Sequence, residues 1–399
     1  MRYIRDRLLS YAIPLLAILL FALLLFGDQK ERTIEEWGYL GQLKLLSKTL
    51  QGLNDRPTDI HADIIGFRGI IENKNAYPII GPALREIGIH WDVRHAHTHP
   101  PTAFLFVAPI SYLPINAGLT VWGYLMIGCI FMSMLLYGFN WRWSLFLTSL
   151  SLYWTPITLS FGQITLIWML GLAIAFKYRN DISSVSGIGI GIASLTKFLP
   201  LITLFPFICR KKWQTILSAV LVWIAALVIV LIFNYETVFE YIVANKVNVS
   251  GVPTRSDNAS LLIGLHRILG FPGLVIMGLS IVGIVCLNRN DFFTSEGISS
   301  RCFMFFSWLS VALLPIAWVY SLAPLFPVLL YFILQKNIVS TLLCLIVLLL
   351  PLFNMPWGNE FVPVSYFCTV TTGALFVIDR LPVKYCRLTY KGPFINVFG

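Results

Sequence analysis

Long apolar runs separated by short polar segments make up most of the chain. The first run extends from Tyr11 to Phe26 after a basic amino end. Later runs cover 117–138, 144–160, 164–176, 185–209, 216–233, 274–287, 303–317, 322–334, 338–352 and 364–378. A helix needs about 20 apolar residues to cross a bilayer. This pattern predicts an all-α, polytopic transmembrane helical bundle with about twelve spans, an uncleaved first span included.

The run 185–209 is predicted to be a broken hairpin of two short helical arms. Its first arm contains the small residues Ser186, Gly187, Gly189, Gly191 and Ala193, which allow close helix packing. Lys197 and Pro200 interrupt the run, so a turn is expected there. Such a break within a membrane is tolerated only where protein or a cavity covers the backbone.

Composition supports a membrane protein, because only 12% of residues are charged and 57% are hydrophobic. A soluble domain carries about 25% charged residues. The net charge of +10 comes from short basic clusters between the apolar runs, which is typical of loops on the cytoplasmic side. The seven cysteines avoid the first long polar loop and show no CxxC spacing, so neither a disulfide framework nor a zinc site is expected.

One integral-membrane domain is therefore predicted over 1–399. Its polar parts are an outer loop 28–116, a second outer loop 234–270 and a cytoplasmic tail 379–399. The first loop is predicted to contain an amphipathic surface helix over 34–50 and a helix over 60–71, begun by Thr58 or Asp59. Irregular chain is expected from Tyr77 to His99, and a short interfacial or half-inserted helix follows over 102–114.

Five polar interruptions fall on the same, outer side when the basic clusters are placed inside. They are the Asp63 loop, Gly162-Gln163, Lys197, Asn258-Ala259-Ser260 and Trp318-Val319-Tyr320. Their convergence predicts a cavity that opens on that side.

Asp63 is the candidate catalytic residue, since a carboxylate at the membrane surface can take a proton from an attacking hydroxyl. The alternative is an acid that stabilises a helix amino terminus, and Asp59 and Asp92 are rival bases. Lys197 is a cation in an apolar stretch and suits a lipid-linked phosphate, with snorkelling to the interface as the alternative. Arg255 and Arg267 are weaker candidates of the same kind.

The alternating histidines His95, His97 and His99 would share one face of an extended chain, as metal ligands can. No cysteine or HExxH pattern accompanies them, so histidines that bond backbone or substrate are favoured. The sequence predicts no metal site and no cofactor, and a divalent metal requirement is left open.

The order of these features resembles a known family. An acidic loop after the first span is followed by Tyr77-Pro78, Pro100-Pro101, LSFGQITL around Gln163, and ASLTKFLP around Lys197. Over roughly residues 60–270 this resembles the bacterial integral-membrane mannosyltransferases of glycosyltransferase family 87, which are C-type enzymes that use a polyprenyl-phosphate sugar.

The resemblance implies an inverting transfer of a hexose, mannose by family default, to a lipid or glycan acceptor at the outer face of a bacterial plasma membrane. Asp63 would be the base. The resemblance places Lys197 near the donor phosphate. The other residues predicted to contact the donor phosphate or substrate are Gln163, Arg68, Tyr77, His97, His99, Asn258, Arg255, Trp318 and Tyr320. The partners would be the bilayer, the donor and the acceptor, with no nucleic acid. A transporter or flippase of lipid-linked glycans and a surface-polysaccharide polymerase or ligase are the alternatives.

Overall fold

The computed structural model describes residues 2–26, 39–53, 58–86, 88–89, 98–154, 156–251, 260–294, 297–314, 319–335, 337–349 and 361–380. In these ranges all regular elements are helices, as predicted. The amino-terminal half contains α1 (Arg2–Phe26), α2 (Tyr39–Leu50), α3 (Asp59–Ile71), α4 (Ile80–Glu86), η1 (Pro101–Ile110), α5 (Ile115–Leu136), α6 (Trp141–Trp154), α7 (Pro156–Ser160), α8 (Thr165–Tyr178) and α9 (Ser183–Thr196).

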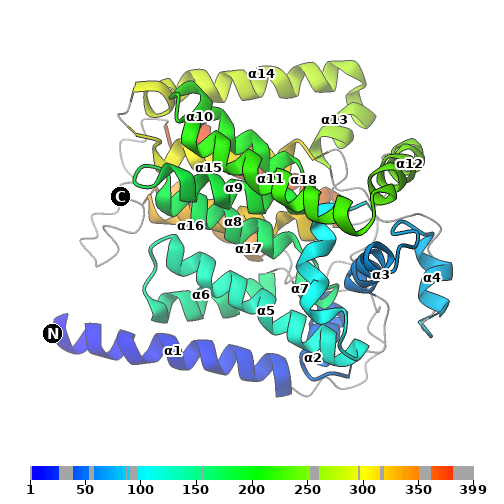
Figure 1. Ribbon diagram of the computed structural model, residues 1–399. Helices are drawn as coiled ribbons and strands as arrows, with labels where there is room; N and C mark the ends of the chain where they lie inside the picture. The colour runs from blue at the N-terminus through cyan, green and yellow to red at the C-terminus, as the bar shows by residue number, and fades with distance from the viewer. Residues whose placement is uncertain are drawn as a thin grey trace.

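The carboxyl-terminal half continues the bundle (Figure 1). It contains η2 (Leu199–Leu204), α10 (Phe205–Cys209), α11 (Trp213–Phe233), α12 (Glu236–Gly251), α13 (Leu261–Leu269), α14 (Phe271–Leu287), the π-helix η4 (Asn290–Thr294), α15 (Ser300–Ala312), η5 (Val319–Leu325), α16 (Phe326–Leu334), α17 (Ile338–Leu349) and α18 (Phe361–Ile378).

Helices α8, α9 and α11 pack closely in the middle of the bundle (Figure 1). A Cβ on Gly189 would lie 2.6 Å from the carbonyl oxygen of Gly171, so neither position has room for a side chain. On the other side of α9, a Cβ on Gly191 would lie 2.8 Å from Val222 Cβ. The prediction that small residues allow close helix packing here is confirmed.

Two helices in the described ranges, α5 and α11, are long and apolar enough to cross a membrane. Shorter apolar helices include Ala12–Leu24, Thr165–Tyr178, Ser183–Thr196 and Phe271–Leu287. Many leucine, isoleucine and phenylalanine side chains of α11 and α14 are exposed, which suits contact with lipid rather than water. The count of about twelve spans stays a prediction.

The broken hairpin is present as predicted. Helix α9 ends at Thr196, Lys197 is extended with φ −156° and ψ 143°, and the second arm consists of η2 and α10. Pro200 stands at the start of η2, where its missing N–H costs no helical hydrogen bond.

Three segments differ from the predictions. The chain between Tyr77 and His99, expected to be irregular, contains the short helix α4, whose Leu84 is buried in a small apolar cluster. The second polar loop contains the helix α12 over much of its length. The run 144–160 is divided into α6 and α7, since Pro156 begins a new helix. In each case local tertiary packing or a proline decides the outcome.

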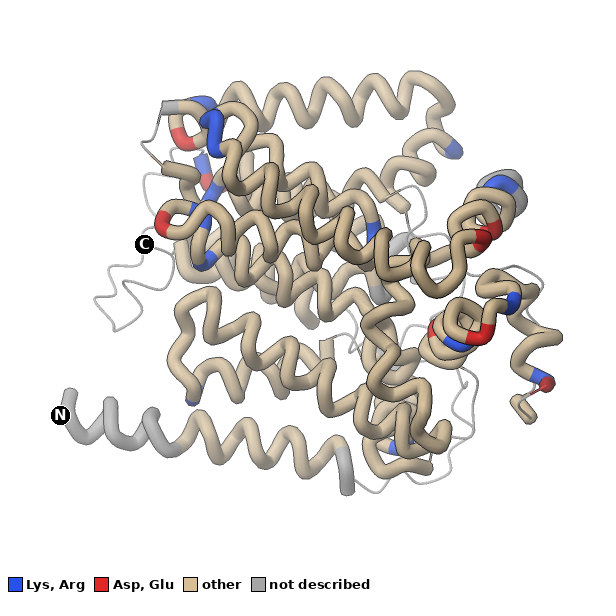
Figure 2. The backbone as a smooth tube through the Cα atoms, viewed as in Figure 1, with Lys and Arg blue, Asp and Glu red and all other residues tan. Residues whose placement is uncertain are grey.

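At the end of the bundle where α8 ends and α11 begins, Lys and Arg predominate, whereas basic and acidic residues are mixed at the opposite end, where α3, α4 and α12 lie (Figures 1 and 2). Hydrogen bonds join several of the predicted cytoplasmic segments at the basic end. Arg179 Nε donates to Ile298 O (2.9 Å), and Lys212 Nζ donates to Arg179 O (2.8 Å).

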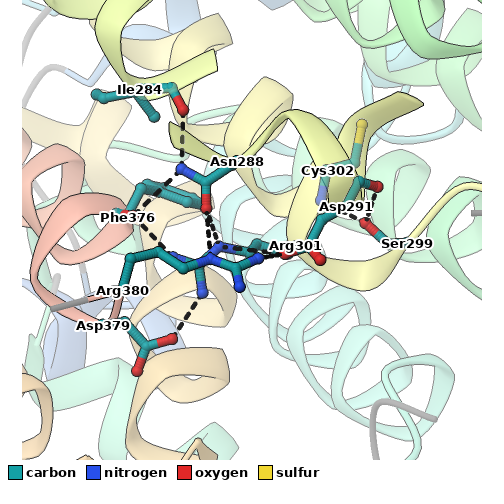
Figure 3. Close-up of polar contacts among 9 residues, drawn as sticks. All are labelled: Ile284, Asn288, Asp291, Ser299, Arg301, Cys302, Phe376, Asp379 and Arg380. Atoms are coloured by element: carbon teal, nitrogen blue, oxygen red, sulfur yellow. Dashed lines mark hydrogen bonds and ion pairs between the residues drawn. The ribbon is translucent and has the colours of Figure 1, made fainter. Parts of the chain in front are cut away.

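A polar network around Arg301 connects three helices at this end of the bundle (Figure 3). The buried guanidinium donates to Asp379 Oδ2 (2.6 Å) and Phe376 O (2.7 Å), and also to Asn288 Oδ1. Arg380 pairs with Asp291 and also bonds to Asn288. Arg301 thus joins α15 to the end of α14 and to the end of α18.

Candidate functional site

Asp63 lies in the second turn of α3, which begins at Asp59, and its side chain is fully buried. Its Oδ1 lies 2.9 Å from Nδ1 of the buried His99. An ionised carboxylate can only accept a hydrogen bond, so Nδ1 of His99 carries the hydrogen in this contact. The structure therefore pairs the predicted base with one of the three alternating histidines.

The amino terminus of α3 is fixed by a local motif. Thr58 is the N-cap residue, and its backbone N–H donates to Nδ1 of His61 (3.0 Å). Burial lowers the pKa of His61 to about 4, so this imidazole is neutral and suited to accept. The predicted cap at Thr58 is confirmed, and it sets the register that brings Asp59 and Asp63 to the same face, four residues apart.

Lys197 lies close to this helix, although 134 residues separate it from Asp63 in the sequence. Thr102 Oγ1 donates to Leu195 O (3.1 Å), which holds the end of α9 beside the segment that follows His99. The Lys197 ammonium contacts Ser321 Oγ at 3.4 Å. The Lys197 charge acts on the pKa of His99, in the same direction as burial, and Asp59 acts on the pKa of Lys197, against burial. The side chains of Asp59, Asp63, His99 and Lys197 therefore form one electrostatic group.

The pKa shifts in this group have burial as their main cause. Burial, together with the nearby Lys197, lowers the pKa of His99 to about 3, so the imidazole is neutral at pH 7. Burial also lowers the pKa of Lys197 to about 8, against the opposing effect of Asp59. The lysine is still mostly cationic at pH 7, which suits an anionic ligand.

Gln163 reaches the group from the turn before α8. Its Nε2 donates to Asp59 Oδ2, and the turn itself is held by Trp122 Nε1, which donates to Gly162 O (2.8 Å). Gly162 has φ +67°, and a Cβ there would lie 2.7 Å from the Ile60 side chain. Only glycine fits this approach between the turn and α3.

The other predicted site residues fall into two sets. Arg68 donates through Nη2 to Ser111 O (2.6 Å), and Tyr77 is buried and donates through its hydroxyl to His99 O (2.8 Å). His95, His97, Asp92, Arg255, Asn258 and Trp318 lie outside the described residues, as does the side chain of Tyr320.

Ser321 and Thr102 were not predicted from the sequence, and Asp59 was predicted only as a cap or a rival base. The spacing of Asp59 and Asp63 was a usable signal for Asp59, since residues four apart share a helix face. No sequence signal links Ser321 to Lys197. Among the described side chains, no group of three or more His, Cys, Asp or Glu is placed to hold a metal ion.

Three of the five predicted polar interruptions thus meet at one end of the bundle: the Asp63 helix, Gln163 and Lys197. The fourth interruption is linked to the chain before the fifth, because Ser260 Oγ donates to the carbonyl oxygen of Leu314, four residues before Trp318.

Comparison with known proteins identifies the family. No curated protein and no solved structure matches this chain. Residues 97–289 match the model of glycosyltransferase family 87, a range that includes His99, Gln163 and Lys197 and begins after Asp63. This match identifies residues 97–289 as a glycosyltransferase family 87 region, and together with the helical fold and the apolar helices α5 and α11 it supports a membrane glycosyltransferase.

Proposed function

We propose that this protein transfers a hexose, with mannose as the first candidate, from a polyprenyl-phosphate donor to a lipid or glycan acceptor, with inversion at the anomeric carbon. The observation that carries the proposal is one polar group that contains a buried carboxylate and a half-buried cation. Asp63 contacts His99, and the charge of Lys197 acts on the same imidazole. A group-transfer reaction that releases a phosphate needs a base and a positive charge at separate points.

In the proposed reaction the Asp63 carboxylate takes the proton of the acceptor hydroxyl. The hydroxyl oxygen forms a bond to the anomeric carbon while the bond from that carbon to the donor phosphate oxygen breaks. The electron pair leaves with the polyprenyl phosphate, whose added negative charge is stabilised by the Lys197 ammonium. Neutral His99 holds one oxygen of Asp63 through Nδ1–H and so orients the carboxylate.

The proposed setting is a bacterial plasma membrane, with the site at the outer face. The support is the charge distribution: Lys and Arg predominate at the end of the bundle remote from α3, whereas basic and acidic residues are mixed near α3 (Figure 2). Basic loops are retained on the cytoplasmic side, so the Asp63 end would face outward.

The test uses the full-length protein in lipid nanodiscs with a radiolabelled polyprenyl-phosphate mannose and a lipid extract of the host cells as acceptor. We expect a labelled product with wild-type protein. Asp63→Asn keeps the size of the side chain and removes the base, so transfer should fall by about 10²-fold or more.

The matched control is Asp181→Asn, an exposed acid beyond the end of α8, which should leave transfer unchanged. Normal turnover by Asp63→Asn, or donor movement across the bilayer without a labelled product, would overturn the proposal.

A further inference from the structure

Helix α12 contacts the loop that follows α3, although more than 150 residues separate them. Glu240 Oε2 accepts a hydrogen bond from the backbone N–H of Ala76 (2.8 Å). Just before the helix, Asn234 Nδ2 donates to Lys74 O (3.2 Å). The Tyr241 ring lies 5.5 Å from the Tyr77 ring, centroid to centroid. Two contacts from α12 and one from the residue that ends α11 thus support four residues of that loop from outside α3.

The same loop leads directly to the Asp63–His99 pair. Tyr77 is buried, and its hydroxyl donates to the carbonyl oxygen of His99 (2.8 Å). The ring of His99 in turn contacts Asp63 at 2.9 Å. A displacement of Tyr77 therefore moves the backbone that positions the imidazole, and with it the orientation of the carboxylate.

The two faces of α12 have different surroundings. Glu240, Tyr241 and Ala244 face the protein, whereas Phe239, Ile242 and Val243 are exposed by 58–67%. Only Asn234 and Tyr235 separate α12 from α11, whose Ile232 is 74% exposed. Because α11 is one of the two helices suited to cross a membrane, the outer face of α12 lies where lipid would cover it.

We propose that α12 is a membrane-surface helix that holds the Asp63–His99 pair in its reactive geometry, and that Glu240 is the positioning residue through which it acts. Glu240 contacts the backbone of Ala76, the next residue Tyr77 contacts the backbone of His99, and the ring of His99 contacts Asp63. Glu240 touches neither reacting group, so its effect falls on the chemical step rather than on donor binding. This inference rests on the proposed role of Asp63.

The test compares Glu240→Ala, which removes the acceptor for the Ala76 N–H, with Glu240→Gln, whose amide oxygen can still accept it. In the donor-transfer assay, Glu240→Ala should lower kcat by about tenfold and leave KM for the donor within about twofold, as loss of one partly buried hydrogen bond predicts. Glu240→Gln should restore most of kcat. The control is Glu236→Gln, an exposed acid one turn earlier on α12, which should behave as wild type.

A second measurement does not depend on activity. Hydrogen exchange of the 72–78 peptide should become faster in Glu240→Ala and stay at the wild-type rate in Glu240→Gln and Glu236→Gln. If exchange follows this pattern while wild-type protein shows no transfer, the proposed function has failed and the structural link stands. Unchanged exchange and unchanged kcat in Glu240→Ala would overturn the inference, as would equal loss of kcat in the alanine and glutamine variants.

Discussion

At the scale of single residues, Lys197 shows how burial changes what a side chain does. A lysine that snorkels to an interface keeps an ordinary pKa, whereas burial brings the pKa of Lys197 to about 8. Because the folded pKa lies below the ordinary value of 10.5, the unfolded chain binds more protons between about pH 8 and 10.5. The cost of burying the ammonium is thus fully present below pH 8 and is relieved as the pH rises through that window.

This shift predicts the pH dependence of the reaction. As the pH rises through about 8, the ammonium is lost, and kcat/KM for the donor should fall with it. Lys197→Arg keeps its charge and should retain activity above pH 9, whereas Lys197→Met should be weak at every pH. Lys177→Arg, an exposed lysine near the end of α8, serves as the control. A pH profile of Lys197→Arg identical to that of wild type would exclude Lys197 as the titrating group.

At the scale of elements, the site depends on how closely α3, η1 and the turn before α8 approach one another. Gly162 lets the turn approach Ile60 of α3, and Gly66 of α3 gives room to the Phe104 ring of η1, which would lie 2.6 Å from a Cβ there. These approaches bring Gln163 to Asp59 and His99 to Asp63. The geometry of the polar group therefore depends on the glycines Gly162 and Gly66 as much as on the polar side chains themselves.

Gly162→Ala tests this dependence. The added methyl meets Ile60, and the positive φ is unfavourable for alanine by about 1–2 kcal/mol. We expect a lower unfolding temperature in detergent, measured by size-exclusion chromatography after heating. We also expect a loss of transfer of about tenfold or more, because Gln163 would no longer reach Asp59. Gly128→Ala in α5, where a Cβ meets nothing within 4 Å, should change neither quantity. Wild-type behaviour of Gly162→Ala would show that the turn tolerates displacement.

At the scale of the whole molecule, the bundle has two polar ends with different tasks. The end with Asp63 and Lys197 collects side chains suited to the proposed reaction. At the other end, Arg301 joins the ends of α14 and α18 to α15 through hydrogen bonds that satisfy its guanidinium (Figure 3). Burial of such a charge is tolerated only with partners of this kind.

Arg301→Met separates stability from activity. The substitution leaves Asp379 and the Phe376 carbonyl without the guanidinium, and such losses typically cost about 3–5 kcal/mol. We expect a marked decrease in unfolding temperature, with donor KM and kcat of the folded fraction unchanged. Arg289→Met removes an exposed charge near the same end and should have a small effect on stability. Equal unfolding temperatures for the two variants would show that the network contributes little.

Hydrophobic pattern alone was enough to predict much of this protein, because the period and length of apolar runs depend on local chain chemistry. It located α5, α8, α9 and α11, and the capping residue Thr58 and the interruption by Lys197 and Pro200 added the helix α3 and the break after α9. The helix α4 and the division at Pro156 were missed, the first because short helices depend on packing partners distant in the sequence.

The candidate site divides in the same way. The residue types, the membrane setting and the choice of Asp63 and Lys197 came from the sequence and its resemblance to a family. Only the tertiary structure decided that His99 contacts Asp63, that Asp59 meets Gln163, and that Tyr77 and Glu240 support the pair from outside. Those contacts join residues between 22 and 164 positions apart, and no local pattern encodes which distant segments a folded bundle brings together.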